Sequence, residues 1–250
     1  MLNVARQISI NTIIAVGMTF VIISGGIDLS VGSVLALTAV LGSDVVFHYP
    51  NVFLALLAGL ILGGVLGLLN GISITQFKIV PFITTLAMMT IIRGTAFVYT
   101  QGRPIAPLPD NYKFLGNGYL SIFPVPVLIT VLVVLLGFYL LKYTTIGRYV
   151  YALGGNEDAV KLSGININTV KLFVYAFAGL LSGLAGIILS ARLGSGDPKL
   201  GTMYELNAIA AVVLGGTSLS GGTGGVLGSV LGSLIIGFLD NGLLLMLVSS

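Results

Sequence analysis

The side chains that could do chemistry in this chain are a few charged and polar residues inside long apolar stretches. Ionisable groups at membrane depth are unfavourable, so they usually face a cavity or a partner. Arg93 is the sharpest case: it could line a polar path, or it could pair with Asp28 or Glu205 and simply hold helices together. The candidate residues of a translocation path are Asp28, Ser30, Asn70, Arg93, Glu205, Asn207, Thr217 and Ser218.

Catalytic chemistry finds no support in the residues. The chain has no Cys, which excludes disulfides, thiolate metal sites and thiol catalysis, and its lone His48 cannot build a metal site. No nucleophile, base and orienting group can be assembled, and no phosphate-binding Gly-x-x-x-x-Gly-Lys-Ser/Thr motif occurs. We therefore expect no catalytic residue, no metal and no cofactor bound by this chain. A formal net charge of only +3 gives no support for nucleic-acid binding.

The composition is that of a membrane protein. Hydrophobic residues make up 56% of the 250 positions and charged residues only 8%, against about 25% charged in soluble domains. A spanning helix needs roughly 20 mostly apolar residues. This window predicts an all-α, polytopic transmembrane bundle in a single domain, 1–250, whose seventh segment is short. The eight predicted segments are 8–26, 29–47, 52–75, 79–101, 121–143, 169–193, 203–219 and 225–247.

Two glycine-rich stretches, 25–33 and 215–223, combine glycine pairs with polar groups at membrane depth. Aligned without gaps, they share glycine at the first, second and eighth positions, leucine at the fifth and serine at the sixth. They are interpreted as helix breaks, which recur near translocation paths; ordinary turns with glycine caps are the alternative. Asp28 is predicted to cap a helix that begins at Leu29.

Small residues also recur every four positions. This spacing places them on one helix face, where two backbones can approach closely; a lining of the transport path is the rival interpretation. The three ridges are Gly59, Gly63, Gly67 and Gly71; Gly224, Gly228 and Gly232; and Ser182, Gly186, Ser190 and Gly194.

The segment 144–168 predicts a short capped helix over 156–163. Gly154 and Gly155 predict a turn, Asn156 is a good N-cap, and Gly164 is a candidate C-terminal cap. About two turns of helix are not stable alone in water, so this helix needs a docking surface, with Val160 and Leu162 beside Ala159 as the candidate contacts. That surface could be lipid headgroups, this protein or another subunit.

The same loop resembles the cytoplasmic coupling loop of ribose-type ABC sugar permeases, within the branched-chain amino acid and sugar importer permease superfamily. Further matches are 15–19 (AVGMT), 25–33, Arg93-Gly94 with 98–100 (VYT), and 205–218 (ELNAIAAVVLGGTS). The resemblance implies that two permease copies form the pore, that ATP binds only to a partner ATP-binding cassette subunit, and that an extracytoplasmic sugar-binding protein delivers substrate. It implies that the coupling contacts are Gly154, Gly155, Asn156, Glu157, Asp158, Ala159, Val160, Lys161, Leu162, Ser163 and Gly164.

The expected function is the permease subunit of an importer for a ribose-like monosaccharide, in a bacterial inner membrane and without enzymatic activity. The alternative is an ion-coupled secondary transporter with Asp28, Glu205 and Asp240 as coupling carboxylates. The Lys and Arg residues of 142–171 place that segment in the cytoplasm; 102–120 and 194–202 are then outer loops, the first either a docking surface or a rigid connector. Compared with the family, the chain is expected to lack the first and last spanning helices.

Overall fold

Long apolar helices form the body of the protein in the computed structural model, which describes residues 2–246. Seven helices of the described part are long and apolar enough to cross a membrane. They are α1 (Leu2–Ile23), α2 (Val31–His48), α3 (Val52–Gln76), α4 (Pro81–Thr100), α6 (Val125–Tyr143), α9 (Ile167–Leu193) and α11 (Val226–Leu245). The all-α prediction is confirmed; residue 247, the end of the last predicted segment, lies outside the described residues.

The predicted short seventh segment is also confirmed. It is α10 (Tyr204–Leu214), with 11 residues. At 1.5 Å per residue it is ~16 Å long, about half of the ~30 Å hydrocarbon core. α10 therefore crosses only part of a bilayer.

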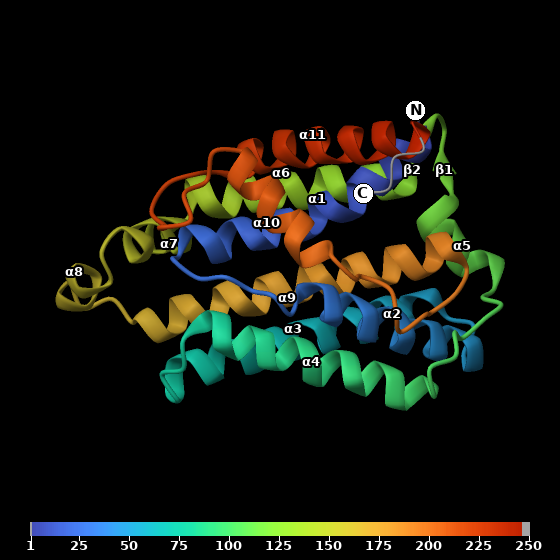
Figure 1. Ribbon diagram of the computed structural model, residues 1–250, viewed down its shortest axis with the longest axis horizontal. Helices are drawn as coiled ribbons and strands as arrows, with labels where there is room; N and C mark the ends of the chain where they lie inside the picture. Colours follow the sequence, from blue (N-terminus) through green and yellow to red (C-terminus); the bar gives the residue numbers. More distant parts are fainter. Residues whose placement is uncertain (1, 247–250) are drawn as a thin grey trace.

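The long helices run side by side along the long axis of the molecule (Figure 1). α9 contacts α1, α2 and α3, while α1 contacts α6, α10 and α11. One end of the bundle, the coupling end, carries α7 (Thr145–Gly155) and α8 (Glu157–Leu162). The opposite end, the far end, carries α5 (Asp110–Asn117) and an antiparallel hairpin of β1 (Tyr119–Leu120) and β2 (Phe123–Pro124).

Burial divides the bundle into a centre and a lipid-facing shell. α1 and α9 are largely buried, whereas α3, α4, α6 and α11 turn large apolar side chains outward. Examples are Ile61, Ile91, Leu132 and Phe238. An exposed apolar area of this extent needs lipid or protein to cover it. The protein is a multi-pass membrane protein.

A glycine seam joins α3 to α9. A methyl group at Gly63 would overlap the carbonyl oxygen of Gly179, and one at Gly59 would overlap the side chain of Ile187. Gly186 meets α2 in the same way, against Leu35. The interpretation of these ridges as packing surfaces therefore fits the structure. In the remaining ridge, Gly228 and Gly232 pack on α10, but Gly224 lies before α11 with φ +132°.

The chain turns back into the bundle at two places. After α1 ends at the coupling end, 24–30 returns towards the middle, where α2 begins (Figure 1). From the far end, 194–203 returns to the middle, where α10 begins. The first return was predicted as a helix break. The second was predicted as an outer loop, and that prediction is wrong: its glycines and Pro198 gave no apolar signal, yet the segment packs against α2 and α4.

The glycine seam gives a matched pair of variants. We expect Gly63→Ala to destabilise the protein by about 1–3 kcal/mol, because the added methyl group forces the backbones of α3 and α9 apart. Gly64→Ala, one residue later, meets open space and serves as the control. Thermal unfolding of both purified variants in the same detergent measures the difference. Equal unfolding midpoints for the two variants would contradict the role of the seam.

Candidate functional site

The N-termini of α2 and α10 meet in the interior of the bundle. Gly32 lies in the first turn of α2, and a side chain there would overlap the Glu205 carboxylate and the Gly201 carbonyl oxygen. Glu205 itself lies in the first turn of α10. Its carboxylate therefore lies beside two helix N-termini, whose partial positive charge favours an anion. Its Oε2 atom is buried and has no hydrogen-bond partner among the described residues.

Asp28, Ser30 and Asn70 form one buried polar cluster. The Asp28 Oδ1 atom accepts hydrogen bonds from the backbone N–H of Ser30 (2.8 Å) and from its hydroxyl (2.6 Å). The Asn70 amide on α3 donates to the Ser30 hydroxyl at 2.8 Å. α2 begins at Val31, so the prediction that Asp28 caps a helix starting at Leu29 is wrong by two residues. The carboxylate instead closes the turn that leads into α2.

Arg93 binds backbone instead of an acid. Its guanidinium donates to the carbonyl oxygens of Pro198 (2.9 Å) and Leu200 in the returning segment 194–203. No described acid lies within ion-pair distance of Arg93, so direct pairing with Asp28 or Glu205, one of the two alternatives, is not observed. Glu205 acts on Arg93 only through the longer-range attraction of opposite charges. The physical reason is that unwound backbone inside a membrane must find hydrogen-bond donors within the protein. Arg93 supplies them from α4.

Asn207 lies apart from that cluster, in a small polar cavity that the sequence did not predict. The cavity has a volume of about 70 Å³ and includes Gln7, Asn11, Tyr204 and Asp240 in its lining. Gln7 and Asn11 are four residues apart and so lie on one face of α1. Two amides at this spacing inside an apolar span could have predicted a polar cavity on this face of α1.

The other two candidate path residues lie at the coupling end. Thr217 is buried and Ser218 half-buried in the loop 215–225, which joins α10 to α11. The eight candidates therefore fall into an interior group (Asp28, Ser30, Asn70, Arg93 and Glu205), the Asn207 cavity, and the loop 215–225. They do not form one site.

A junction of glycine backbones joins three segments at the coupling end. The Gly222 N–H donates to the Ile23 carbonyl oxygen at 2.9 Å. A methyl group at Gly154 would overlap that same oxygen, and one at Gly221 would press on Gly154 and Gly25. The predicted turn at Gly154 and Gly155 is wrong, because both residues continue the helix α7. Glycine is needed at 154 for close approach and not for a turn.

Tyr151 adds a side-chain contact to this junction. Its hydroxyl donates to the Gly224 carbonyl oxygen at 2.8 Å. Burial raises the pKa of this hydroxyl above its ordinary value, so it remains a donor at neutral pH. Tyr151 thereby ties α7 to the loop before α11.

The predicted short helix is α8, with six residues. The Asn156 side chain accepts the Ala159 N–H at 2.9 Å, and Gly164 takes a positive φ of +77°, so both predicted caps are confirmed. Val160 is buried against this protein, whereas Leu162 is 90% exposed. Of the three predicted apolar contacts, Leu162 and the smaller Ala159 are exposed and therefore available to a partner.

An ion pair holds α8 on the bundle. The Lys171 ammonium on α9 lies 2.8 Å from one Glu157 oxygen and 2.9 Å from the other. The Lys171 side chain is 20% exposed, so the pair is partly shielded from water. The pair therefore links α8 directly to α9.

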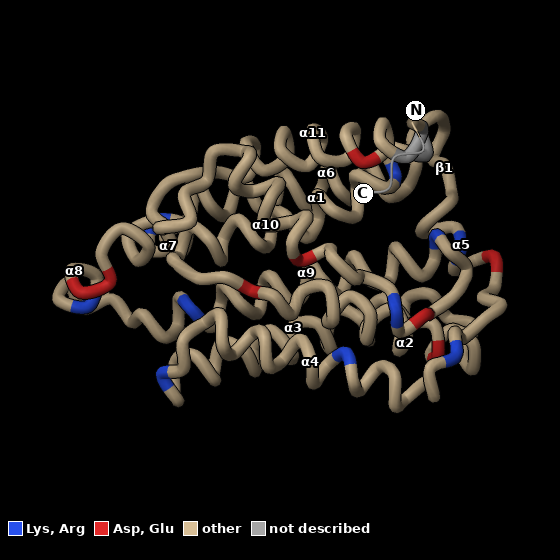
Figure 2. The backbone as a smooth tube through the Cα atoms, viewed as in Figure 1, with Lys and Arg blue, Asp and Glu red and all other residues tan. Residues whose placement is uncertain are grey.

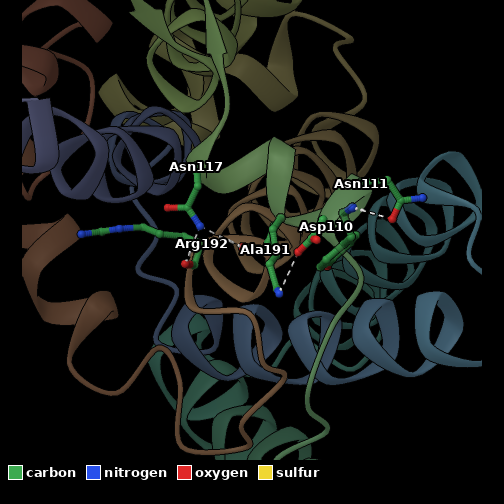
Figure 3. Close-up of polar contacts among 7 residues, drawn as sticks. Asp110, Asn111, Asn117, Ala191 and Arg192 are labelled. Atoms are coloured by element: carbon green, nitrogen blue, oxygen red, sulfur yellow. Dashed lines mark hydrogen bonds and ion pairs between the residues drawn. The ribbon is translucent and has the colours of Figure 1, made fainter.

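The far end is covered by α5, which is fixed to α9. In Figure 3 the Asn117 amide points at the end of α9, where it donates to the Arg192 carbonyl oxygen at 2.8 Å. The Tyr112 hydroxyl shares a hydrogen bond of 2.7 Å with Ser190, and burial raises its pKa to about 12 although this hydrogen bond acts in the opposite direction. The predicted outer loop 102–120 is thus an anchored cap.

Comparison with known proteins supplies the family. The family model described as branched-chain amino acid transport system / permease component matches residues 1–249. The chain is 52% identical to the ribose import permease protein RbsC of Haemophilus influenzae and 53% identical to that of Bacillus subtilis; each match covers 100% of this chain and 78% of the relative. It is 37% identical to the xylose transport system permease protein XylH of Haemophilus influenzae, over 96% of this chain and 81% of that protein. No solved structure matches the chain.

The glycine junction also gives a matched pair. We expect Gly154→Ala to displace α7 from α1 and from the loop 215–225, since the new methyl group would overlap backbone atoms of both. Gly155→Ala meets open space and is the control. The measurement is the rate of trypsin cleavage after Arg148 and Lys161, both exposed, together with the unfolding midpoint. We expect faster cleavage by about tenfold for Gly154→Ala alone, because about 1–3 kcal/mol of overpacking favours the open state. The same rate in both variants would show that the contact is not needed.

Proposed function

This chain belongs to the family of branched-chain amino acid transport system permease components, and from that premise we propose that it imports a ribose-like monosaccharide as the membrane subunit of an ATP-binding cassette system. Its relatives at 52% and 53% identity are named ribose import permeases, whereas the one at 37% is named for xylose. The greater similarity to the ribose group favours ribose or a close analogue as the substrate.

The observation that carries this proposal is that α8 packs on the bundle with one face and exposes an apolar side chain on the other. One face is fixed by buried Val160 and by the Glu157–Lys171 ion pair, and the opposite face presents Leu162 to the outside. A short helix fixed to a bundle on one side and apolar on the other is suited to a groove on a second protein. We propose that this protein is the ATP-binding subunit, which places the coupling end in the cytoplasm. ATP binds to that subunit and not to this chain.

A continuous series of contacts connects α8 with the interior of the bundle. The ion pair leads to α9, and α7 leads through Gly154 to the end of α1 and to the loop 215–225. That loop continues into α10, whose other end lies beside the start of α2 at Glu205. We propose that closure of the ATP-binding subunits moves α10 relative to α2, and so opens and closes the path.

The remaining partners follow from the surfaces at the far end and along the bundle. The anchored cap of α5 and the β1–β2 hairpin is the proposed docking surface for a sugar-binding protein. A second copy of this chain completes the pore in the proposal. The polar cavity at Asn207 and Asp240, with its amide and carboxylate groups, is a candidate contact for sugar hydroxyls.

An ion-coupled secondary transporter is the second candidate, because the Asp28 and Glu205 carboxylates lie in the interior. Uptake of labelled ribose into proteoliposomes distinguishes the two. We expect uptake only when the ATP-binding subunit, ATP and the binding protein are all present. Uptake driven by a proton or sodium gradient, with the permease alone, would overturn the proposal.

Leu162 tests the coupling surface. We expect Leu162→Ala to weaken binding of the ATP-binding subunit by about tenfold or more, as at an apolar interface anchor, and to reduce uptake accordingly. The unfolding midpoint should stay unchanged, because the side chain is 90% exposed. Leu120→Ala, at a leucine 57% exposed on the far end, is the control. Wild-type binding by Leu162→Ala would remove this residue from the interface.

Arg93 tests the interior. We expect Arg93→Ala to reduce ribose uptake by about tenfold or more, because the carbonyl groups of the returning segment 194–203 lose a charged donor. The amount of protein in the membrane fraction should not change. Thr95→Ala, at an exposed position of the same helix, is the control. Normal uptake by Arg93→Ala would exclude Arg93 from the path.

A further inference from the structure

A basic cavity opens at the coupling end between the α3–α4 turn and the α8–α9 segment. Its volume is about 610 Å³. Three lysines and one glutamate line it, a formal charge of +2: Lys78, Lys161, Lys171 and Glu157. In Figure 2, Lys and Arg positions mark the α3–α4 turn, α8 and the start of α9. Of these four residues, the proposed transport mechanism gives a role only to Glu157 and Lys171, through their ion pair.

Two of the three lysines have no counter-charge of their own. Glu157 is engaged by Lys171, and neither Lys78 nor Lys161 belongs to any ion pair of the described residues. They approach the cavity from different elements, Lys78 from the α3–α4 turn and Lys161 from α8. The cavity therefore keeps an unbalanced positive charge at a point where three elements meet.

The backbone adds to this charge. The lining includes Val80 and Pro81 at the start of α4 and Asn166 and Ile167 at the start of α9. Both helices thus begin at the cavity wall, with the positive ends of their dipoles at that wall. The first turn of α4 has no side-chain cap, and Pro81, its first residue, has no N–H, so at this wall α4 contributes only the partial positive charge of its dipole.

The edge of the cavity is apolar and faces outward. Phe77 and Val80 are exposed beside Lys78, and Phe82 and Ile83 continue this edge onto the exposed face of α4. A soluble anion gains no binding free energy from contact with exposed apolar side chains. A lipid does, because its acyl chains can lie along α4 while its phosphate enters the basic cavity. Basic pockets between spanning helices at the cytoplasmic side are suited to anionic headgroups.

We infer that this cavity is a binding site for the phosphate headgroup of an anionic phospholipid. Lys78 and Lys161 hold the phosphate, and the exposed edge of α4 holds the acyl chains. Because Lys161 belongs to α8, a lipid bound there contacts the coupling helix and the α3–α4 turn together. The site thereby links the composition of the membrane to the position of α8.

The test uses the purified full chain in a neutral detergent with added phosphatidylglycerol, and measures retained lipid by native mass spectrometry. Two double variants each remove two cations from the coupling end: Lys78→Gln with Lys161→Gln, and, as control, Lys142→Gln with Arg148→Gln outside the cavity. We expect about tenfold weaker phosphatidylglycerol binding in the first and near wild-type binding in the second. Unfolding midpoints in phosphatidylcholine confirm that both variants are folded.

Three outcomes would overturn the inference. An equal loss in both double variants would show only a general attraction between cations and lipid. A second outcome is that soluble glycerol 3-phosphate raises the unfolding midpoint as much as phosphatidylglycerol does. That result would show that the acyl chains and the apolar edge contribute nothing to binding, and it would identify a soluble phosphate as the ligand. Unchanged lipid binding in the first variant, with weaker binding of the ATP-binding subunit, would assign the lysines to a protein interface. None of these results depends on whether the transported sugar is ribose.

Discussion

Backbone polar groups inside a membrane must be satisfied within the protein, and this constraint shapes the interior of the bundle. Two segments leave helical geometry there, 24–30 and 194–203. The Asp28 carboxylate accepts the Ser30 N–H in the first, and the Arg93 guanidinium binds two carbonyl oxygens of the second. Polar side chains of Asp28 and Arg93 thus make it possible to start α2 and α10 inside the bundle, where their N-termini meet.

Where no side chain fits, glycine allows a second backbone segment to approach and satisfy a buried backbone polar group. At the coupling end, the Gly222 N–H satisfies the Ile23 carbonyl oxygen, which the end of α1 would otherwise leave without an intrahelical partner. Such contact between backbones is possible only because Gly154, Gly221 and Gly25 carry no side chains. The α3–α9 seam works in the same way. Both contacts are stiff, since backbone cannot rotate away as a side chain can, and stiff contacts transmit displacement.

The two ends of the bundle differ in what they offer to other molecules. The far end is closed by α5, which is anchored to α9 through Asn117 and buried Tyr112. The coupling end carries a helix of six residues held by one ion pair and one buried valine. In the proposed mechanism, helix α8 is therefore the element that a partner displaces, and it lies in contact with elements that lead to α1, α9 and the loop 215–225.

The sequence by itself determined the class of protein, because composition and span length depend on residue types alone. It also determined the caps of α8 and the shortness of α10, since both follow from local patterns: a capping Asn, a terminal Gly, and the length of an apolar run. It located the break after α1 through paired glycines and a buried acid. The small-residue ridges predicted which helix faces would pack closely.

Only the tertiary structure decided how the polar residues are partnered, because partners come from distant segments. Arg93 binds the carbonyl oxygens of Pro198 and Leu200 instead of an acid, and the sequence contains no local mark of that contact. The return of 194–203 into the bundle and the helical state of Gly154 were missed for the same reason. Glycine signals both a turn and a close approach, and only the packed neighbours, here Ile23 and Gly222, distinguish the two.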